Sequence, residues 1–273
     1  MFSSNRVVLR RLRFAGPLVL VGAGVTIACS ALPALAYRPF DGTDAAVADA
    51  NEIEIELQPL GWQRQDQQKT LITPGVRFNY GFAQRWEFVA EGQFETPLSP
   101  SGPSSFTAND VLLKYIVKPG VLQDQTGLSI ATEFGPLLPE LNGDRGTGFS
   151  WAAILSQRWD WGTAHFNVEA NLTRDQQGEA FLDVILEGPA NWKVRPVLEV
   201  FYDKVWTQTE TYSGLVGAIW QVWDNLSFDA GFRYALVNRH PVNEIRAGLT
   251  FAFDVGGAAT KPGVTFGNWG LSR

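Results

Sequence analysis

The chain is poor in the residues that build disulfides, metal sites and most hydrolytic active sites. Its 273 residues include one cysteine, Cys29, and two histidines, His165 and His240, which lie far apart in the sequence. A single cysteine gives no internal disulfide framework. The H-E-x-x-H motif, the G-x-S-x-G motif and a glycine-rich phosphate loop are missing as well. The sequence therefore predicts no enzyme, with no catalytic residues, no metal ligands and no cofactor.

Long apolar runs and basic residues are also scarce. After residue 36 there is no stretch of about 20 consecutive apolar residues, so no membrane-spanning helix is expected. The chain carries 22 Lys and Arg against 28 Asp and Glu, which gives a formal net charge of −6. An acidic chain of this kind is a poor partner for nucleic acid.

The N-terminus has the form of a secretory signal peptide. An apolar stretch, FAGPLVLVGAGVTIACSALP, follows a basic start and precedes the small residues ALA at positions 34–36. The basic start consists of Arg6, Arg10, Arg11 and Arg13. Cleavage after Ala36 removes Cys29 and leaves 18 basic against 28 acidic residues, a formal charge of about −10. A retained anchor and lipoprotein cleavage before Cys29 are the alternatives, but the run is short and broken by Gly and Pro, and TIAC lacks a Leu-rich pattern.

The rest of the chain alternates between apolar and polar residues with a period of two. In NEIRAGLTFAF (243–253), Leu249 and Phe251 are apolar whereas Glu244 and Thr250 are polar. Alternate side chains of a strand point to opposite faces of the sheet, so one face meets an apolar environment and the other a polar one. The rhythm recurs in EIEIEL (52–57), RWEFVAEGQFE (85–95), AHFNVEANL (164–172), EAFLDVILE (179–187), KVRPVLEVFYD (193–203) and LSFDAGFRY (226–234). About twelve such segments without a helical period predict an all-β chain.

The connectors between these segments alternate in length. Short ones are YGFAQRW (80–86), WDWGTA (159–164), GPANWK (188–193) and VWDNLS (222–227), and long polar ones are GWQRQDQQKT (61–70), PLSPSGPSSFTAND (97–110), PELNGDRGTG (139–148) and TRDQQGE (173–179). Outer-membrane barrels have short periplasmic turns and long outer loops, and in lipid only helices and closed barrels satisfy every backbone group. The sequence thus predicts an antiparallel transmembrane β-barrel of about twelve strands with both termini periplasmic.

This architecture divides the chain into four parts. We expect a signal peptide at 1–36, a periplasmic N-terminal segment at 37–50, the barrel at 51–253 and a C-terminal tail at 254–273. In the tail, Gly256, Gly257 and Pro262 disfavour a further strand. The tail is therefore expected outside the barrel wall, either loose in the periplasm or folded into the lumen as a partial plug.

Tryptophans gather at the predicted strand ends. Indole rings favour membrane–water interfaces, because the ring is apolar and its N–H requires a polar partner. The alternative is a soluble β-sandwich whose core holds the same tryptophans. The residues expected at the membrane interface are Trp86, Trp159, Trp161, Trp192, Trp220 and Trp223.

The polar faces of the strands carry many charged residues. One interpretation is a pore lining that selects solutes by charge; the other is an internally salt-bridged lumen that only holds the shape of the barrel. Because acids outnumber bases, an open pore is expected to prefer cations. The predicted lining residues are Arg77, Glu87, Glu91, Glu95, Lys114, Glu133, Arg158, Glu169, Asp183, Glu187, Arg195, Glu199, Asp229, Arg233, Glu244 and Arg246.

Three stretches resemble a known group, the outer-membrane proteins named after the MetA pathway of phenol degradation. They are RPFDGTDAAVADANEIEIEL (38–57), TPGVRFNYGFAQRWEFVAEG (73–92) and NDVLLKYIVKPG (109–120), and the likeness continues diffusely to RAGLTFAF (246–253). The resemblance covers most of the mature chain. It implies an outer-membrane barrel and hints at uptake of apolar or aromatic compounds, and it supplies no catalytic residues. The tail after Phe253 departs from the group, which is expected to end near that phenylalanine.

These observations together predict a monomeric protein of the outer membrane of a Gram-negative bacterium. We expect a passive channel or facilitator for small solutes, with outer-membrane lipid and the barrel-assembly machinery as partners. The alternatives are a non-conducting barrel, plugged by its termini and serving as a structural or assembly partner, and a soluble periplasmic β-sandwich.

Overall fold

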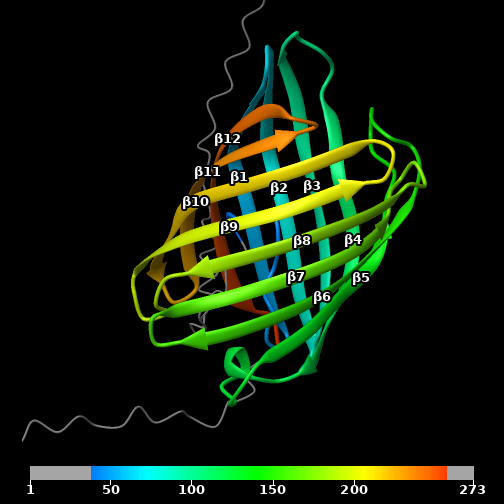
Figure 1. Ribbon diagram of the computed structural model, residues 1–273. Coiled ribbons are helices and arrows are strands. Elements are labelled where there is room, and N and C mark those ends of the chain that lie inside the picture. The colour runs from blue at the N-terminus through cyan, green and yellow to red at the C-terminus, as the bar shows by residue number, and fades with distance from the viewer. Residues whose placement is uncertain (1–37, 257–273) are drawn as a thin grey trace, which may run out of the picture.

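The computed structural model describes residues 38–256. Twelve strands within this range form one closed antiparallel sheet, in which each strand pairs with its neighbours in the chain and β1 pairs with β12 (Figure 1). They are β1 (Glu52–Gln65), β2 (Gln68–Ala83), β3 (Trp86–Ser99), β4 (Ser105–Lys118), β5 (Ser129–Leu137), β6 (Gly148–Trp159), β7 (Gly162–Leu172), β8 (Gly178–Glu187), β9 (Val194–Val205), β10 (Thr209–Trp223), β11 (Leu226–Val237) and β12 (His240–Asp254). The predicted all-β barrel of about twelve strands is confirmed.

Helical structure contributes little to this part of the chain. A single 3₁₀ turn, η1 (Val121–Gln123), lies between β4 and β5. Within residues 38–256 no helix has the length and apolar character needed to cross a membrane.

The exterior of the barrel is apolar because strand alternation sends one set of side chains outward. Leu198, Val216, Phe232 and Ile245 stand side by side in the registers of β9 to β12, and each is 41–56% exposed. Between them the inward side chains are buried; Thr250 of β12, for example, is 0% exposed. A continuous outward row of large apolar side chains is what a lipid-facing wall requires.

The two ends of the barrel differ. Both β1 and β12 reach one end, where Glu52 pairs with Asp254; we call it the terminal end and the opposite one the loop end. Residues 61–70, expected as a long loop, instead belong to the facing ends of β1 and β2, which pair as far as Gln65 and Gln68. The polar composition of this stretch does not prevent pairing, because a hairpin end can carry polar side chains on both faces while its backbone hydrogen bonds continue.

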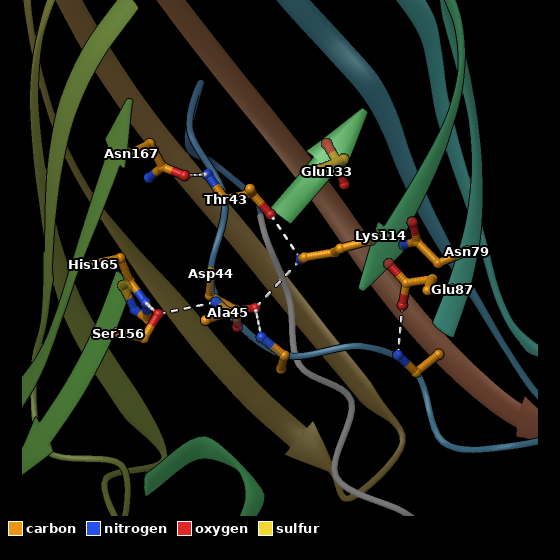
Figure 2. A network of polar contacts seen from close by, with 12 residues as sticks. Thr43, Asp44, Ala45, Asn79, Glu87, Lys114, Glu133, Ser156, His165 and Asn167 are labelled. Carbon is orange, nitrogen blue, oxygen red and sulfur yellow. Dashed lines mark hydrogen bonds and ion pairs between the residues drawn. The ribbon is translucent and has the colours of Figure 1, made fainter. Parts of the chain in front are cut away.

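The largest departure from expectation concerns the N-terminal segment. It was predicted as a periplasmic segment at 37–50, but its described residues lie inside the barrel (Figures 1 and 2). A barrel of twelve strands is too wide for its own inward side chains to fill. Small residues in DGTDAAVADA (41–50) let a main chain pass through that space. We call residues 38–51 the lumen segment.

Candidate functional site: the lumen and the segment that crosses it

The lumen segment is held through its backbone N–H groups. These groups donate hydrogen bonds to carboxylates and other polar side chains of the wall. Asp41 N and Gly42 N both donate to Glu199 Oε1 of β9, at 2.7 and 2.8 Å. Glu199 is 0% exposed. A buried main chain must find partners for its N–H groups, and an ionised carboxylate is a strong acceptor. The wall of the barrel thus takes the role that a neighbouring strand has in a sheet.

Further along, the segment runs across β7, β6 and β4 (Figure 2). Ala45 N donates to Ser156 Oγ at 2.9 Å, and Ser156 in turn lies 2.8 Å from His165 Nδ1. On β4, Lys114, which is 0% exposed, donates to Thr43 Oγ1 at 3.2 Å. The same ammonium pairs with the Asp44 carboxylate at 3.6 Å. Polar groups of β4, β6 and β7 therefore hold the middle of the segment.

The start of the segment is fixed by Arg246 of β12. Its guanidinium donates to Pro39 O at 2.9 Å, to Asp41 Oδ1 at 3.3 Å and to Glu244 Oε1 at 2.9 Å. Arg246 is 6% exposed. A guanidinium has five N–H donors in a fixed planar array, so one side chain can join the segment to a wall carboxylate.

Apolar side chains also point into the lumen, which the polar-inside rule did not predict. Phe40 of the segment packs against Val197, Leu215 and Ile219, and Ala45 belongs to a second buried group with Ile154. These wall residues lie in inward positions of their strands and are at most 5% exposed. The inner face of the barrel is therefore partly a conventional core, formed between the wall and the segment.

The segment divides the lumen into chambers. A cavity of about 460 Å³ lies on its loop side, lined by residues that include Arg38, Gln63, Arg77 and Glu95. A second cavity of about 460 Å³ lies on its terminal side, between residues 46–49 and the turn after β4. A third, of about 240 Å³, adjoins the first and is lined by Glu133, Glu169 and Glu179 among others. Each chamber contains more acidic than basic lining residues.

All sixteen residues predicted as pore lining lie on the lumen face. Arg77 contacts three acids from three strands, at 3.9 Å from Glu56, 2.8 Å from Glu91 and 2.9 Å from Glu133. Other lumen ion pairs join Arg195 to Glu187 and Arg233 to Glu244. Arg158 shares the inward face of β6 with Ser156. Those that line the three chambers are Arg77, Glu87, Glu91, Glu95, Glu133, Glu169, Arg233, Glu244 and Arg246.

Some of these lining residues are covered rather than open to the chambers. Lys114, Asp183 and Glu199 are at most 1% exposed, because the lumen segment lies against them. Lys114 and Glu199 bind the segment, and Gly42 covers Asp183, so all three would meet passing solute only if the segment moved. Asp229 is likewise buried and faces Arg38 at 3.7 Å.

Sequence reasoning missed three further polar residues that help to hold the segment. Ser156, His165 and Asn167 are buried and inward, and Asn167 Oδ1 accepts from Thr43 N at 3.4 Å. Alternation along AHFNVEANL did place His165 and Asn167 on the polar face, but it gave no sign of their partner.

The six tryptophans expected at the membrane interface lie at the terminal end. Trp159 and Trp161 stack at 5.1 Å beside the β6–β7 turn, and Trp86 packs on Tyr115 at 4.4 Å. Trp192, Trp220 and Trp223 are more than half exposed near the β8–β9 and β10–β11 turns. The predicted signal peptide and the tail beyond Gly256 lie outside the described residues.

A closed sheet with an apolar exterior and a charged interior defines the class: this is an outer-membrane β-barrel protein. The COG4313 outer membrane channel from Pseudomonas putida F1 has a similar fold, with a TM-score of 0.61 at 9% identity, covering 78% of this chain and 100% of that one. NanC porin is similar with a TM-score of 0.51 at 8% identity, covering 73% and 98%. No protein-family profile and no curated protein sequence matches the chain. At such low identity the likeness establishes the fold.

Proposed function

We propose that the protein is a passive channel for small solutes, oriented with its terminal end in the periplasm and its loop end outside. The observation that carries this proposal is the set of polar, charged chambers on both sides of the lumen segment. A barrel built only as a structural element has no need of water-sized space lined by charged groups. We further propose that it inserts as a monomer through the barrel-assembly machinery and that it catalyses no reaction.

The finer family assignment is also a proposal. The stretches at 38–57, 73–92 and 109–120 support membership in the group named after the MetA pathway of phenol degradation. Uptake of apolar or aromatic compounds would follow from that membership. The three chambers inside the lumen are mainly polar, so an apolar solute would have to cross the barrel in contact with charged side chains.

The sealed barrel is the second candidate, and a specific observation favours it. The lumen segment crosses the interior and is bound to β3, β6, β7 and β9 through Glu87, Ser156, Asn167 and Glu199. Solute can pass only if this segment shifts. The channel and the sealed barrel therefore differ in one property, which is whether the lumen segment can move away from the wall residues that bind it.

A disulfide that fixes the segment tests this property. A Cβ placed on Gly42 would lie 2.9 Å from Asp183 Cγ, which brings the two positions within the range of a disulfide. The variant Gly42→Cys/Asp183→Cys, oxidised and placed in a planar bilayer, is expected to show little conductance, and reduction with dithiothreitol is expected to increase it severalfold. Cleavage after Ala36 would remove Cys29, so no other thiol interferes.

The controls are the two single-cysteine variants, which should conduct equally with and without the reductant. Correct insertion of each protein is checked by its shift on a gel after boiling. If the wild type and both the reduced and oxidised forms of the variant show no conductance, the sealed barrel is the correct description. If the oxidised form conducts as well as the reduced one, solute bypasses the segment and our account of the lumen is wrong.

Charge selectivity is a separate prediction. The chamber on the terminal side is lined by Asp49, Glu52, Glu54, Glu87 and Asp124 against Arg85 as its one base. We expect the open channel to prefer K⁺ over Cl⁻, and the preference to fade as salt rises, because screening shortens the reach of these charges. Reversal potentials in a KCl gradient measure it. Anion preference would contradict the lining described above.

A further inference from the structure

The loop end of the lumen contains an aromatic ring surrounded by carboxylates. Phe181 of β8 lies directly opposite Glu169 of β7 and Asp203 of β9, and Glu179 lies two residues before it on the same face. All four side chains face the lumen, because the outward positions between them, such as Leu182, are exposed to the exterior. We call these four residues the Phe181 site.

The acids of the Phe181 site form no ion pair with a basic side chain of the described residues. None of Glu169, Glu179 and Asp203 is in an ion pair with any residue in the range 38–256; Glu169 and Glu179 receive only the amide of Asn171, at 3.4 and 3.2 Å. The carboxyl groups of Glu179 and Asp203 contact each other. Asp203 Oδ1 is buried and lacks a hydrogen-bond partner within the described chain. Three acidic side chains therefore lie together here without a basic partner among residues 38–256, and a bound cation would offset the cost of gathering their charges.

The neighbouring arginines do not supply that counter-ion. Arg174 and Arg77 line the same cavity of about 240 Å³ as Glu169 and Glu179. The Arg174 guanidinium is bound to Asp110 at 2.7 Å and to Leu138 O at 2.7 Å. Arg77 is bound to Glu91 and Glu133. Both guanidinium groups are thus bound to acids outside the Phe181 site.

The rings of this wall already accept one cation. Phe181 contacts Phe201 at 5.0 Å between centroids, and the guanidinium of Arg233 stands 5.9 Å above the Phe201 ring. One step deeper on the face of Phe181, Asp183 lies opposite Phe201; it is 1% exposed and its Oδ1 has no hydrogen-bond partner among the described residues. An aromatic face with adjacent carboxylates is the arrangement that recognises ammonium groups.

We propose that the Phe181 site binds small organic cations that carry a quaternary or substituted ammonium group. Phe181 supplies the ring face, and Glu169, Glu179 and Asp203 supply the negative charge. The site lies toward the loop end of β7, β8 and β9, and two of its acids, Glu169 and Glu179, line the cavity of about 240 Å³. The inference deepens the proposed channel function, on which its physiological role rests, by naming the class of solute that is retained at the mouth.

The test compares two probes of equal shape in a binding assay that needs no conduction. Choline chloride and its uncharged isostere 3,3-dimethylbutan-1-ol are titrated into the full-length mature protein in detergent, followed by calorimetry. We expect choline to bind and the isostere not to bind. Glu179→Gln/Asp203→Asn should weaken choline binding about tenfold through the loss of two charges. Phe181→Leu should weaken it about threefold through loss of the ring face.

The matched control is Glu95→Gln, which removes an acid at the loop end of β3, five strands away from β8, and should leave choline affinity unchanged. Each variant must show the heat-dependent gel shift of the folded barrel. Absence of choline binding, equal binding of the isostere, or unchanged affinity in the double variant would each overturn the proposal. A barrel that binds choline but never conducts would overturn the channel proposal and leave this one standing.

Discussion

Replacing Arg246 by methionine is expected to destabilise the barrel by about 3 kcal/mol and to raise its conductance. The change removes a 6% exposed guanidinium whose partners are Pro39 O, Asp41 and Glu244. Glu244 keeps Arg233 at 2.6 Å, but Asp41 loses its ion pair and Pro39 O loses its donor. A buried acceptor without a partner is costly, so the start of the lumen segment should be released from β12.

Reversible urea unfolding in lipid vesicles measures the free energy of unfolding, and planar-bilayer recording measures the conductance of the same variant. Arg195→Met is the control, because Arg195 pairs with Glu187 of the neighbouring strand at 3.3 Å and forms no ion pair with residues 38–51. It should cost about 1 kcal/mol or less and leave conductance unchanged. Equal effects of the two substitutions on conductance would show that Arg246 does not hold the segment.

Replacing Val216 by arginine on the outer face is expected to cost about 2–4 kcal/mol of stability in the membrane. Val216 is 56% exposed near the middle of β10 and lies between Leu198 and Phe232 in the apolar row. An arginine there must extend toward the headgroups or draw water into lipid, and both are unfavourable near the midplane.

The comparison variant places the same side chain on the inner face. Gln93 lines the loop-side chamber, where a new guanidinium meets water and several carboxylates. Gln93→Arg should therefore cost about 1 kcal/mol or less, measured by the same urea unfolding in vesicles. If Gln93→Arg proved as costly as Val216→Arg, the assignment of lipid and lumen faces would have to be reversed or abandoned.

Alternation in the sequence was sufficient to determine the strands and their faces. Inward and outward positions in segments such as 243–253 follow from parity, because successive side chains of a strand point to opposite sides whatever the strand packs against. This is why every charged residue predicted for the lumen, from Arg77 to Arg246, lies there. It is also why a closed barrel of about twelve strands could be expected from the connectors and the lack of an apolar helix.

The alternation rule, which expects lipid on one side of the wall and water on the other, was wrong where the inner face is apolar. Ile154 and Ile185 point inward and are at most 1% exposed, in strands that also carry polar inward residues such as Ser156 and Asp183. The lumen segment supplies Ala45 to the cluster around Ile154, so apolar side chains are stable there. The alternation within one strand carries no information about a segment that is distant in the sequence and packs against the inner face of that strand.

The course of the lumen segment and the Phe181 site were decided by tertiary structure alone. Glu199 accepts from Asp41, a residue 158 positions away, and no periodicity links the two. Phe181 meets Glu169 and Asp203 only because the registers of β7, β8 and β9 bring them into one row. The sequence by itself determined which side of the wall each residue faces. Closure of the sheet and the stagger of its strands decided which of those residues became neighbours, because both are properties of the whole barrel.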